Sequence, residues 1–345
     1  MTKILVIGNG FDLAHGLHTK YIDFLNFLKL YKDTAFRNQK IASEEFLILE
    51  SDDENVIKEK RKLIYEKTIE LNSSSYPNIP EEYLQFLFNN STQNTLIKYY
   101  MIRAKKLSEN WIDFEKELEQ IINDYKLYFS SPKDNPLKFE YLQVWGEKNN
   151  RIAFWNKLKR ELSKLCDCLK IYLSYCLDYS AINEYPAMIY EENFDRLLSF
   201  NYTDTYNLVA SSRLYQNITG ENIHHIHGTV NNIVLGISAT DSDDFETIYF
   251  KKVFQRFQQH TGIQYANWLN ESGEKSVTFF GHSLDITDGD IIKRLILSSQ
   301  ETIIYYYNQS DYEQKVINLM KIFSVKDFED LYYNDKRSIV FKPLT

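Results

Sequence analysis

Four short segments of the chain carry residue types suited to ligand binding and acid–base chemistry, and each lies at the end of a short, largely apolar run. Apolar runs of this length predict buried strands, and the glycines and polar residues that end them predict turns at the strands' carboxyl ends. Because an open α/β sheet binds its ligands at those ends, we expect the four segments to surround one site. The segments are Gly8-Asn9-Gly10-Phe11-Asp12, Phe200-Asn201-Tyr202-Thr203-Asp204, His224-His225-Ile226-His227-Gly228 and Phe279-Phe280-Gly281-His282-Ser283-Leu284-Asp285.

The first segment has glycines at the first two positions of a dinucleotide-binding turn. Gly8 and Gly10 would allow a pyrophosphate to approach the N-terminus of the next helix, where unpaired N–H groups favour an anion. The third small residue of the dehydrogenase fingerprint would fall at position 13, which holds Leu13. A second strand that ends in an acidic residue is also missing at the spacing the fingerprint requires. A hydride-transfer enzyme is therefore disfavoured. The alternative is a plain strand-to-helix turn in which Asp12 only caps the helix.

Asn201 and His227 are the candidate catalytic residues. The Asn201 amide can hold a sugar hydroxyl or an attacking water, and histidine is the usual general base near neutral pH. Alternatively, Asn201 caps the following helix or turns the chain. His225 and His227 share a strand face that a metal could use, but no carboxylate or cysteine lies at a ligand-like spacing nearby, so we expect no metal.

The fourth segment supplies a small, polar turn. Gly281 and Ser283 could contact a ribose or phosphate through the backbone and a hydroxyl. Asp285, Asp288 and Asp290 lack the spacing and the closing Glu of a calcium loop, and we expect them to cap the helix that begins near position 289.

The elements that must position these segments form one α/β domain with a helical insertion. Ile4–Ile7, before Gly8, predicts a strand buried on both faces of a parallel sheet. The next such runs come only after Arg196, and the interval is charge-rich with apolar residues at helical spacing. We therefore expect a Rossmann-like domain of residues 1–30 and 191–345, interrupted by an α-helical insertion over 31–190. Later strands are predicted at Leu197–Tyr202, Ile223–Ile226, Ile233–Ile237, Val277–Phe280 and Ile303–Tyr307, and helices at Tyr21–Leu28, Phe154–Cys176 and Ile291–Leu297.

Composition narrows the class of protein. The formal net charge of −8 argues against general nucleic-acid binding, which needs clustered Lys and Arg. Three cysteines within one short segment make neither a disulfide framework nor a zinc knuckle, and fit the reduced cytoplasm. The apolar start of the chain is too short for a signal peptide or a membrane span, so we expect no membrane association.

Read in order, the four segments resemble the sirtuin family. Gly8–Asp12 with Gly16-Leu17 resembles its opening glycine motif, Asn201 its Gln-Asn-Ile, His227-Gly228 its His-Gly, and Gly281–Leu284 its Gly-Thr-Ser-Leu. More closely, Ile7–Leu17, Asn201–Thr205 and Gly281–Asp285 are similar to the bacteriophage abortive-infection AbiH family. That resemblance implies a bacterial antiviral protein whose activation harms the infected cell.

The sirtuin resemblance implies a sheet of the sirtuin kind and assigns roles to individual residues. Asn201 and His227 would act at the nicotinamide ribose. The chain departs from the family in lacking Cys-x-x-Cys pairs between His227 and Gly281, and in placing Thr203 where sirtuins carry an acid. The residues expected to contact NAD are Gly8, Asn9, Gly10, Phe11, Asp12, His15, Gly281, His282, Ser283 and Asp285.

The leading hypothesis is an NADase that converts NAD⁺ to ADP-ribose and nicotinamide, with activity held low until a trigger or assembly state is reached. A non-catalytic sensor of NAD or ADP-ribose is the alternative, and a metal-dependent nuclease built on His225, His227 and Asp285 is a weaker one. NAD or a related nucleotide is the expected ligand, and a phage-derived trigger and a homo-oligomer are the partner classes left open.

Overall fold

The computed structural model divides the chain into two compact units. The sheet unit comprises Met1–Thr19 and Asp178–Thr345, and the helical unit comprises Lys20–Leu177. Both boundaries fall earlier in the chain than the expected insertion over 31–190. The structure describes residues 1–29, 79–107, 112–148, 150–182, 186, 189, 192–210, 218–238, 245–261, 263–333 and 338–344.

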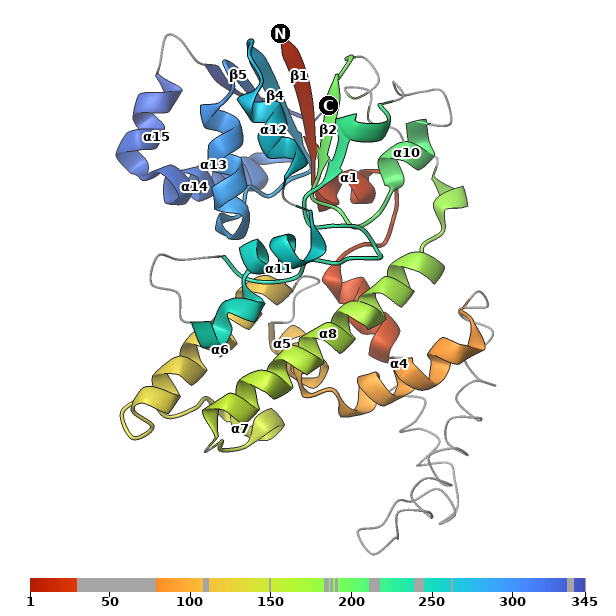
Figure 1. The fold of residues 1–345 in the computed structure, drawn as a ribbon, viewed down its shortest axis with the longest axis vertical. Coiled ribbons are helices and arrows are strands. Elements are labelled where there is room, and N and C mark those ends of the chain that lie inside the picture. Colours follow the sequence, from red (N-terminus) through yellow and green to blue (C-terminus); the bar gives the residue numbers. More distant parts are fainter. Residues whose placement is uncertain are drawn as a thin grey trace, which may run out of the picture. The chain divides into compact units, whose positions relative to one another are not determined.

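The sheet unit contains six parallel strands in the order β3-β2-β1-β4-β5-β6 (Figure 1). This is the order of doubly wound nucleotide-binding folds, in which the direction of winding reverses between β1 and β4. The Rossmann-like α/β fold predicted from the sequence is therefore confirmed. The strands are β1 (Thr2–Ile7), β2 (Arg196–Ser199), β3 (Ile223–His225), β4 (Lys275–Phe280), β5 (Glu301–Tyr306) and β6 (Ser338–Pro343).

Helices cover both faces of the sheet and form three layers with it. Ile4 and Val6 of β1 belong to one buried cluster, while Leu5 and Ile7 belong to another, because successive side chains of a strand point to opposite faces. In Figure 1, α13, α14 and α15 lie on one side of the strands, and α1 and α10 lie on the other. The helices are α1 (Asn9–Ala14), α10 (Thr205–Ala210), α11 (Lys252–Gln259), α12 (Gln264–Asn270), α13 (Gly289–Leu297), α14 (Gln309–Phe323) and α15 (Val325–Tyr332), with 3-10 turns η2 (Tyr179–Ala181), η3 (Gly220–Asn222), η4 (Phe245–Phe250) and η5 (Ile286–Asp288).

One predicted strand is wrong and one strand was not predicted. Ile233–Ile237 makes only an isolated bridge, between Ile237 and Lys251. The backbone N–H of Val234 donates instead to the carbonyl of His227, so the run is a buried loop folded against the end of β3. β6 was missed because its apolar stretch is short and lies between charged residues.

All regular structure described in the helical unit is helical, and aromatic side chains form its core. Tyr125 stacks on Phe154 with ring centroids 3.9 Å apart, and Tyr100 stacks on Phe114 at 4.2 Å. Asp113 begins α6 by accepting hydrogen bonds from two backbone N–H groups. Residues 21–29 form the first helix, and the others are α4 (Glu81–Gln93), α5 (Thr95–Leu107), α6 (Phe114–Ser130), α7 (Phe139–Trp145) and α8 (Arg151–Tyr175).

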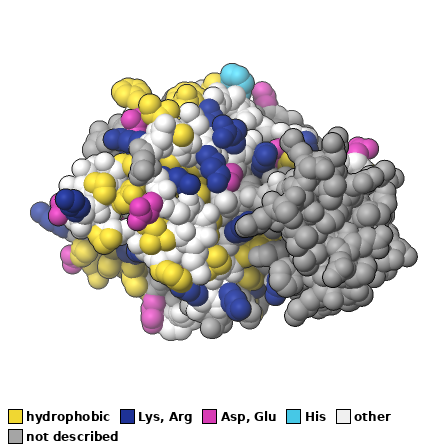
Figure 2. Space-filling view, turned by 90° about the horizontal axis from the view of Figure 1, so that it is seen from below, with side chains coloured by type: hydrophobic (Ala, Val, Ile, Leu, Met, Phe, Trp, Pro, Cys, Tyr) yellow, Lys and Arg dark blue, Asp and Glu magenta, His cyan; other side chains and the backbone are white. Residues whose placement is uncertain are grey.

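The described surface is mixed in character. Figure 2 shows Lys and Arg side chains in small groups between hydrophobic, acidic and uncharged ones on the face that it presents. Among the helices that the structure describes, none combines the length and the apolar character needed to cross a bilayer.

Candidate functional site

The predicted site segments follow four neighbouring strands at the carboxyl edge of the sheet. The turn after β1 begins at Gly8, and those after β2, β3 and β4 contain Asn201, His227 and Gly281. Since all four strands are parallel and adjacent, these turns meet at one edge, beside the point where the winding reverses.

The glycines of the first and fourth segments pack directly against each other. The N–H of Gly10 donates to the carbonyl of Gly281 at 2.8 Å, and the N–H of Gly8 donates to the carbonyl of Phe280 at 3.2 Å. A Cβ at Gly10 would lie 2.7 Å from the Cα of Gly281, and one at Gly281, whose φ is +64°, would lie 2.3 Å from the nitrogen of Phe11. The close approach of two backbones thus explains these glycines in this structure.

Asn201 links the turn after β2 to the turn after β1. Its side-chain N–H donates to the carbonyl of Gly8 at 3.0 Å, and its backbone N–H donates to the hydroxyl of Ser199 at 3.1 Å. Its own carbonyl accepts a hydrogen bond from Nδ1 of His225 at 3.0 Å. The Asn201 side chain is therefore buried and fixed between two strand ends.

Asp12 is a buried carboxyl group in the same region. Thr203 donates its hydroxyl to Oδ2 of Asp12 at 2.6 Å. Thr205 and Asn201 lie near the carboxyl group, yet Oδ1 of Asp12 and Oγ1 of Thr205 have no hydrogen-bond partner among the described residues. Burial raises the pKa of Asp12 from 3.8 to about 6, and the neighbouring polar groups oppose this only in part.

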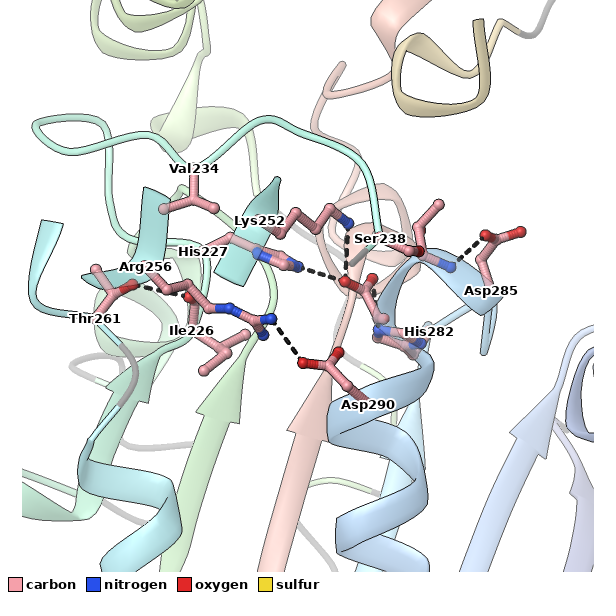
Figure 3. A network of polar contacts seen from close by, with 12 residues as sticks. Ile226, His227, Val234, Ser238, Lys252, Arg256, Thr261, His282, Asp285 and Asp290 are labelled. Carbon is pink, nitrogen blue, oxygen red and sulfur yellow. Dashed lines mark hydrogen bonds and ion pairs between the residues drawn. The ribbon is translucent and has the colours of Figure 1, made fainter. Parts of the chain in front are cut away.

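His227 lies at the end of β3 in contact with an aspartate that our sequence analysis did not assign to the site. Its Nε2 lies 2.9 Å from Oδ1 of Asp288, and Nζ of Lys252 donates to the same oxygen at 2.8 Å (Figure 3). All three side chains are buried. Burial alone would raise the pKa of Asp288, but Lys252 and His227 hold it well below its ordinary value. Burial lowers the pKa of His227, so its imidazole is neutral at pH 7.

A second imidazole, that of His282, completes this cluster. Its Nδ1 accepts the backbone N–H of Leu284 at 2.9 Å, and its Nε2 lies 3.8 Å from Oδ2 of Asp288. Burial lowers the pKa of His282 to about 4. The ring of Phe200 packs edge-on against both imidazoles, with centroids 4.2 Å from His282 and 5.2 Å from His227.

Three predicted ligand contacts on the α1 side have structural partners. The Phe11 ring is fully buried in the core, and His15 donates from Nδ1 to the carbonyl of Phe11 at 2.7 Å. Oδ1 of Asn9 accepts the hydroxyl of Thr19 at 2.6 Å. These side chains hold the first turn in shape.

The rest of the fourth segment is more open. Ser283 is exposed, and its carbonyl accepts a hydrogen bond from the side chain of Asn318 at 3.0 Å. Asp285 caps η5 by accepting the N–H of Thr287, and not the helix that begins at Gly289 as we expected. Asp288 occupies the cap position of α13 without capping it, because its carboxylate binds His227 and Lys252 instead.

The three residues of the nuclease alternative contact different groups. His225 bonds to the carbonyl of Asn201, His227 bonds to Asp288, and Asp285 caps η5. In the described ranges of the chain, no three His, Cys, Asp or Glu side chains are grouped as metal ligands.

A cavity of about 380 Å³ lies beside β3, at the outer edge of the sheet. Its walls include His225, Gly228, Asn232 and Gln264. It opens next to the turn that carries His227, and its walls combine amide and imidazole groups with aliphatic ones.

Lys252 and Asp288 are the site residues that the sequence did not reveal. A lysine in the first turn of an amphipathic helix and an aspartate before a helical glycine are ordinary on a protein surface. Their contact joins residues 36 positions apart in the chain, and no local pattern signals it.

The strand order and the polar cluster at the carboxyl edge define a Rossmann-like α/β protein with its candidate site beside the topological switch point. The family model described as "Bacteriophage abortive infection AbiH" matches residues 4–308, and the chain therefore belongs to that family. Membership assigns it to antiviral defence by abortive infection. No curated protein and no solved structure matches the chain.

Proposed function

We propose that the chain is an abortive-infection effector that hydrolyses NAD⁺ to ADP-ribose and nicotinamide. The observation that carries this proposal is the buried imidazole of His227. Its Nδ1 has no hydrogen-bond partner among the described residues, while its Nε2 is held by Asp288. A buried nitrogen without a partner costs free energy that a ligand can recover. A hydroxyl or water bound there would supply the missing hydrogen bond and could give up its proton.

The balanced reaction needs such a base. The bond between C1′ of the ribose and the nicotinamide nitrogen breaks, and its electron pair leaves with nicotinamide, which departs as a neutral molecule. The oxygen of water bonds to the cation-like C1′, and a proton from that water passes to the base. We assign this proton to His227, which burial keeps neutral at pH 7, and the positioning of the water or of a ribose hydroxyl to Asn201.

The strand order supports a dinucleotide as the substrate. Sheets with the order 3-2-1-4-5-6 bind dinucleotides at the carboxyl edge where the winding reverses, which is the edge that carries Asn201, His227 and Ser283. Ser283 is exposed and free of the tight packing around Gly8 and Gly281, so we assign it to the adenosine half.

A second candidate function is binding of NAD or ADP-ribose without turnover. It is favoured by the hydrogen bond from the N–H of Gly10 to the carbonyl of Gly281, which occupies an amide that a pyrophosphate would use. A ligand that breaks this bond would shift the turns to a second arrangement, as expected of a sensor. In an enzyme, the arrangement in which Gly10 is hydrogen-bonded to Gly281 would correspond to a resting state.

The test is nicotinamide release from NAD⁺ by the purified chain, with and without extract from phage-infected cells. Release by the wild type in either condition, lost in Asn201→Ala, supports the enzyme. NAD⁺ binding measured by calorimetry with no nicotinamide in either condition overturns hydrolysis and supports the sensor. If NAD⁺ does not bind and no nicotinamide is released, both the enzyme and the sensor proposals are overturned.

A further inference from the structure

Asp288 is the centre of a buried charged cluster, and capping of α13 does not require such a cluster. Oδ1 of Asp288 receives hydrogen bonds from Lys252 at 2.8 Å and from His227 at 2.9 Å. The side chain of Lys252 is 2% exposed and that of Asp288 is 11% exposed. Burying two charges is costly, and an exposed aspartate at this position could have capped α13 at no such cost. The cluster therefore calls for a reason beyond helix capping.

The contacts in the cluster determine which nitrogen of His227 carries the hydrogen. The ammonium of Lys252 keeps Asp288 ionised, and an ionised carboxylate can only accept hydrogen bonds. The Nε2 of His227 must then be the donor. In a neutral imidazole the other nitrogen holds a lone pair, so Nδ1, the atom with no partner among the described residues, is a hydrogen-bond acceptor.

The neighbouring imidazole cannot serve in the same way. Nδ1 of His282 already accepts the N–H of Leu284 at 2.9 Å, so its lone pair is used within the protein. Of the two imidazoles beside Asp288, His227 alone offers an unused acceptor among the described contacts.

We propose that Asp288 and Lys252 are positioning residues, which hold His227 with its hydrogen on Nε2 so that Nδ1 is the atom that accepts the proton during hydrolysis. The part of this inference that concerns proton transfer during hydrolysis rests on the proposed function. Asp288 also supplies the negative charge that favours the imidazolium once the proton has arrived. Two other charged groups near the ring, Lys252 and Arg256 of α11, are positive and disfavour the imidazolium of His227. The remaining titratable group, His282, is neutral.

The kinetic test compares Asp288→Asn with Asp290→Asn. Asp290 lies two residues further along, pairs with Arg256 at 2.7 Å and is 56% exposed, so its replacement removes the same charge without touching His227 (Figure 3). We expect Asp288→Asn to lower kcat on the order of 10²-fold or more with KM changed less than about threefold, and to move the acidic limb of the kcat profile to lower pH. Asp290→Asn should keep the wild-type kcat and profile. An Asp288→Asn enzyme with wild-type kcat and an unmoved acidic limb overturns the inference.

A second measurement does not depend on activity. Its result comes from the wild-type chain, and a variant serves only to assign the signals. Histidine labelled with ¹⁵N in the full wild-type chain reports the protonated nitrogen of each ring, and His227→Gln identifies the signals of His227. We expect the tautomer protonated on Nε2 at pH 7. Protonation on Nδ1, or on both nitrogens, overturns the inference. If the expected tautomer is found but no nicotinamide is released under any condition, the proposed function fails and the assignment of the tautomer stands.

Discussion

The buried carboxyl group of Asp12 should make the protein less stable when it is ionised, and this cost can be measured. Its pKa is raised from 3.8 to about 6 by burial, so the folded chain binds a proton between these pH values where the unfolded chain does not. The contribution of Asp12 to stability is therefore most favourable below pH 4 and declines as the pH rises through this window. At about 1.4 kcal/mol for each tenfold change in proton affinity, ionised Asp12 costs on the order of 3 kcal/mol above pH 6.

The variant Asp12→Asn removes that cost because it mimics the protonated carboxyl. Its amide oxygen can accept the hydroxyl of Thr203, and its N–H₂ can donate toward Thr205, whose Oγ1 has no partner among the described residues. Urea unfolding followed by circular dichroism should give equal free energies of unfolding for variant and wild type near pH 4. The variant should be more stable by on the order of 3 kcal/mol at pH 8. Nicotinamide release should fall, since Asp12 is among the residues expected to contact NAD. A variant no more stable than the wild type at pH 8 would show that ionised Asp12 does not destabilise the fold.

Three further predictions follow from single contacts. Gly281→Ala places a Cβ 2.3 Å from the nitrogen of Phe11 and should lower the free energy of unfolding, measured in urea, by roughly 3 kcal/mol or more. Gly16→Ala is the control, because Gly16 is also at positive φ but its Cβ would meet nothing within 4 Å in the described chain, and it should cost only about 1 to 2 kcal/mol. Equal losses of stability in the two variants would contradict the packing argument. His227→Ala should lower turnover by about 10² to 10⁴, and unchanged nicotinamide release would remove His227 from the mechanism. Asp113→Ala removes the cap of α6 and should cost about 1 kcal/mol of stability, with Asp113→Asn as the tolerated control; a wild-type unfolding midpoint for the alanine variant would show that the cap is dispensable.

The centre of the sheet could be predicted because β1 and β4 are buried on both faces. Ile4–Ile7 is a continuous apolar run, Val277–Phe280 is apolar except for Thr278, and both are followed by glycine. Such runs have few alternatives to a central parallel strand. Ile233–Ile237 has the same apolar character but folds as a buried loop, since apolar content alone does not distinguish a strand from a buried loop.

The site was predictable in its location more than in its contacts. Asn201 and His227 follow strands, and the parallel topology brings strand ends together without any knowledge of side chains. The use of Gly8 and Gly10 for packing against Gly281, and the pairing of Asp288 with Lys252, depend on distances between segments far apart in the chain. No local sequence rule encodes such distances.

A crystal structure with carba-NAD, an analogue whose ribose ring oxygen is replaced by carbon and which resists hydrolysis, would show directly whether NAD⁺ binds at the carboxyl edge of the sheet. We predict the nicotinamide-bearing ring within hydrogen-bond distance, about 3 Å, of Asn201 and of Nδ1 of His227, with the turn at Gly10 and Gly281 parted around the pyrophosphate. Electron density for the analogue only in the cavity at the outer side of β3, or at any place away from the carboxyl ends of β1, β2, β3 and β4, would contradict this prediction.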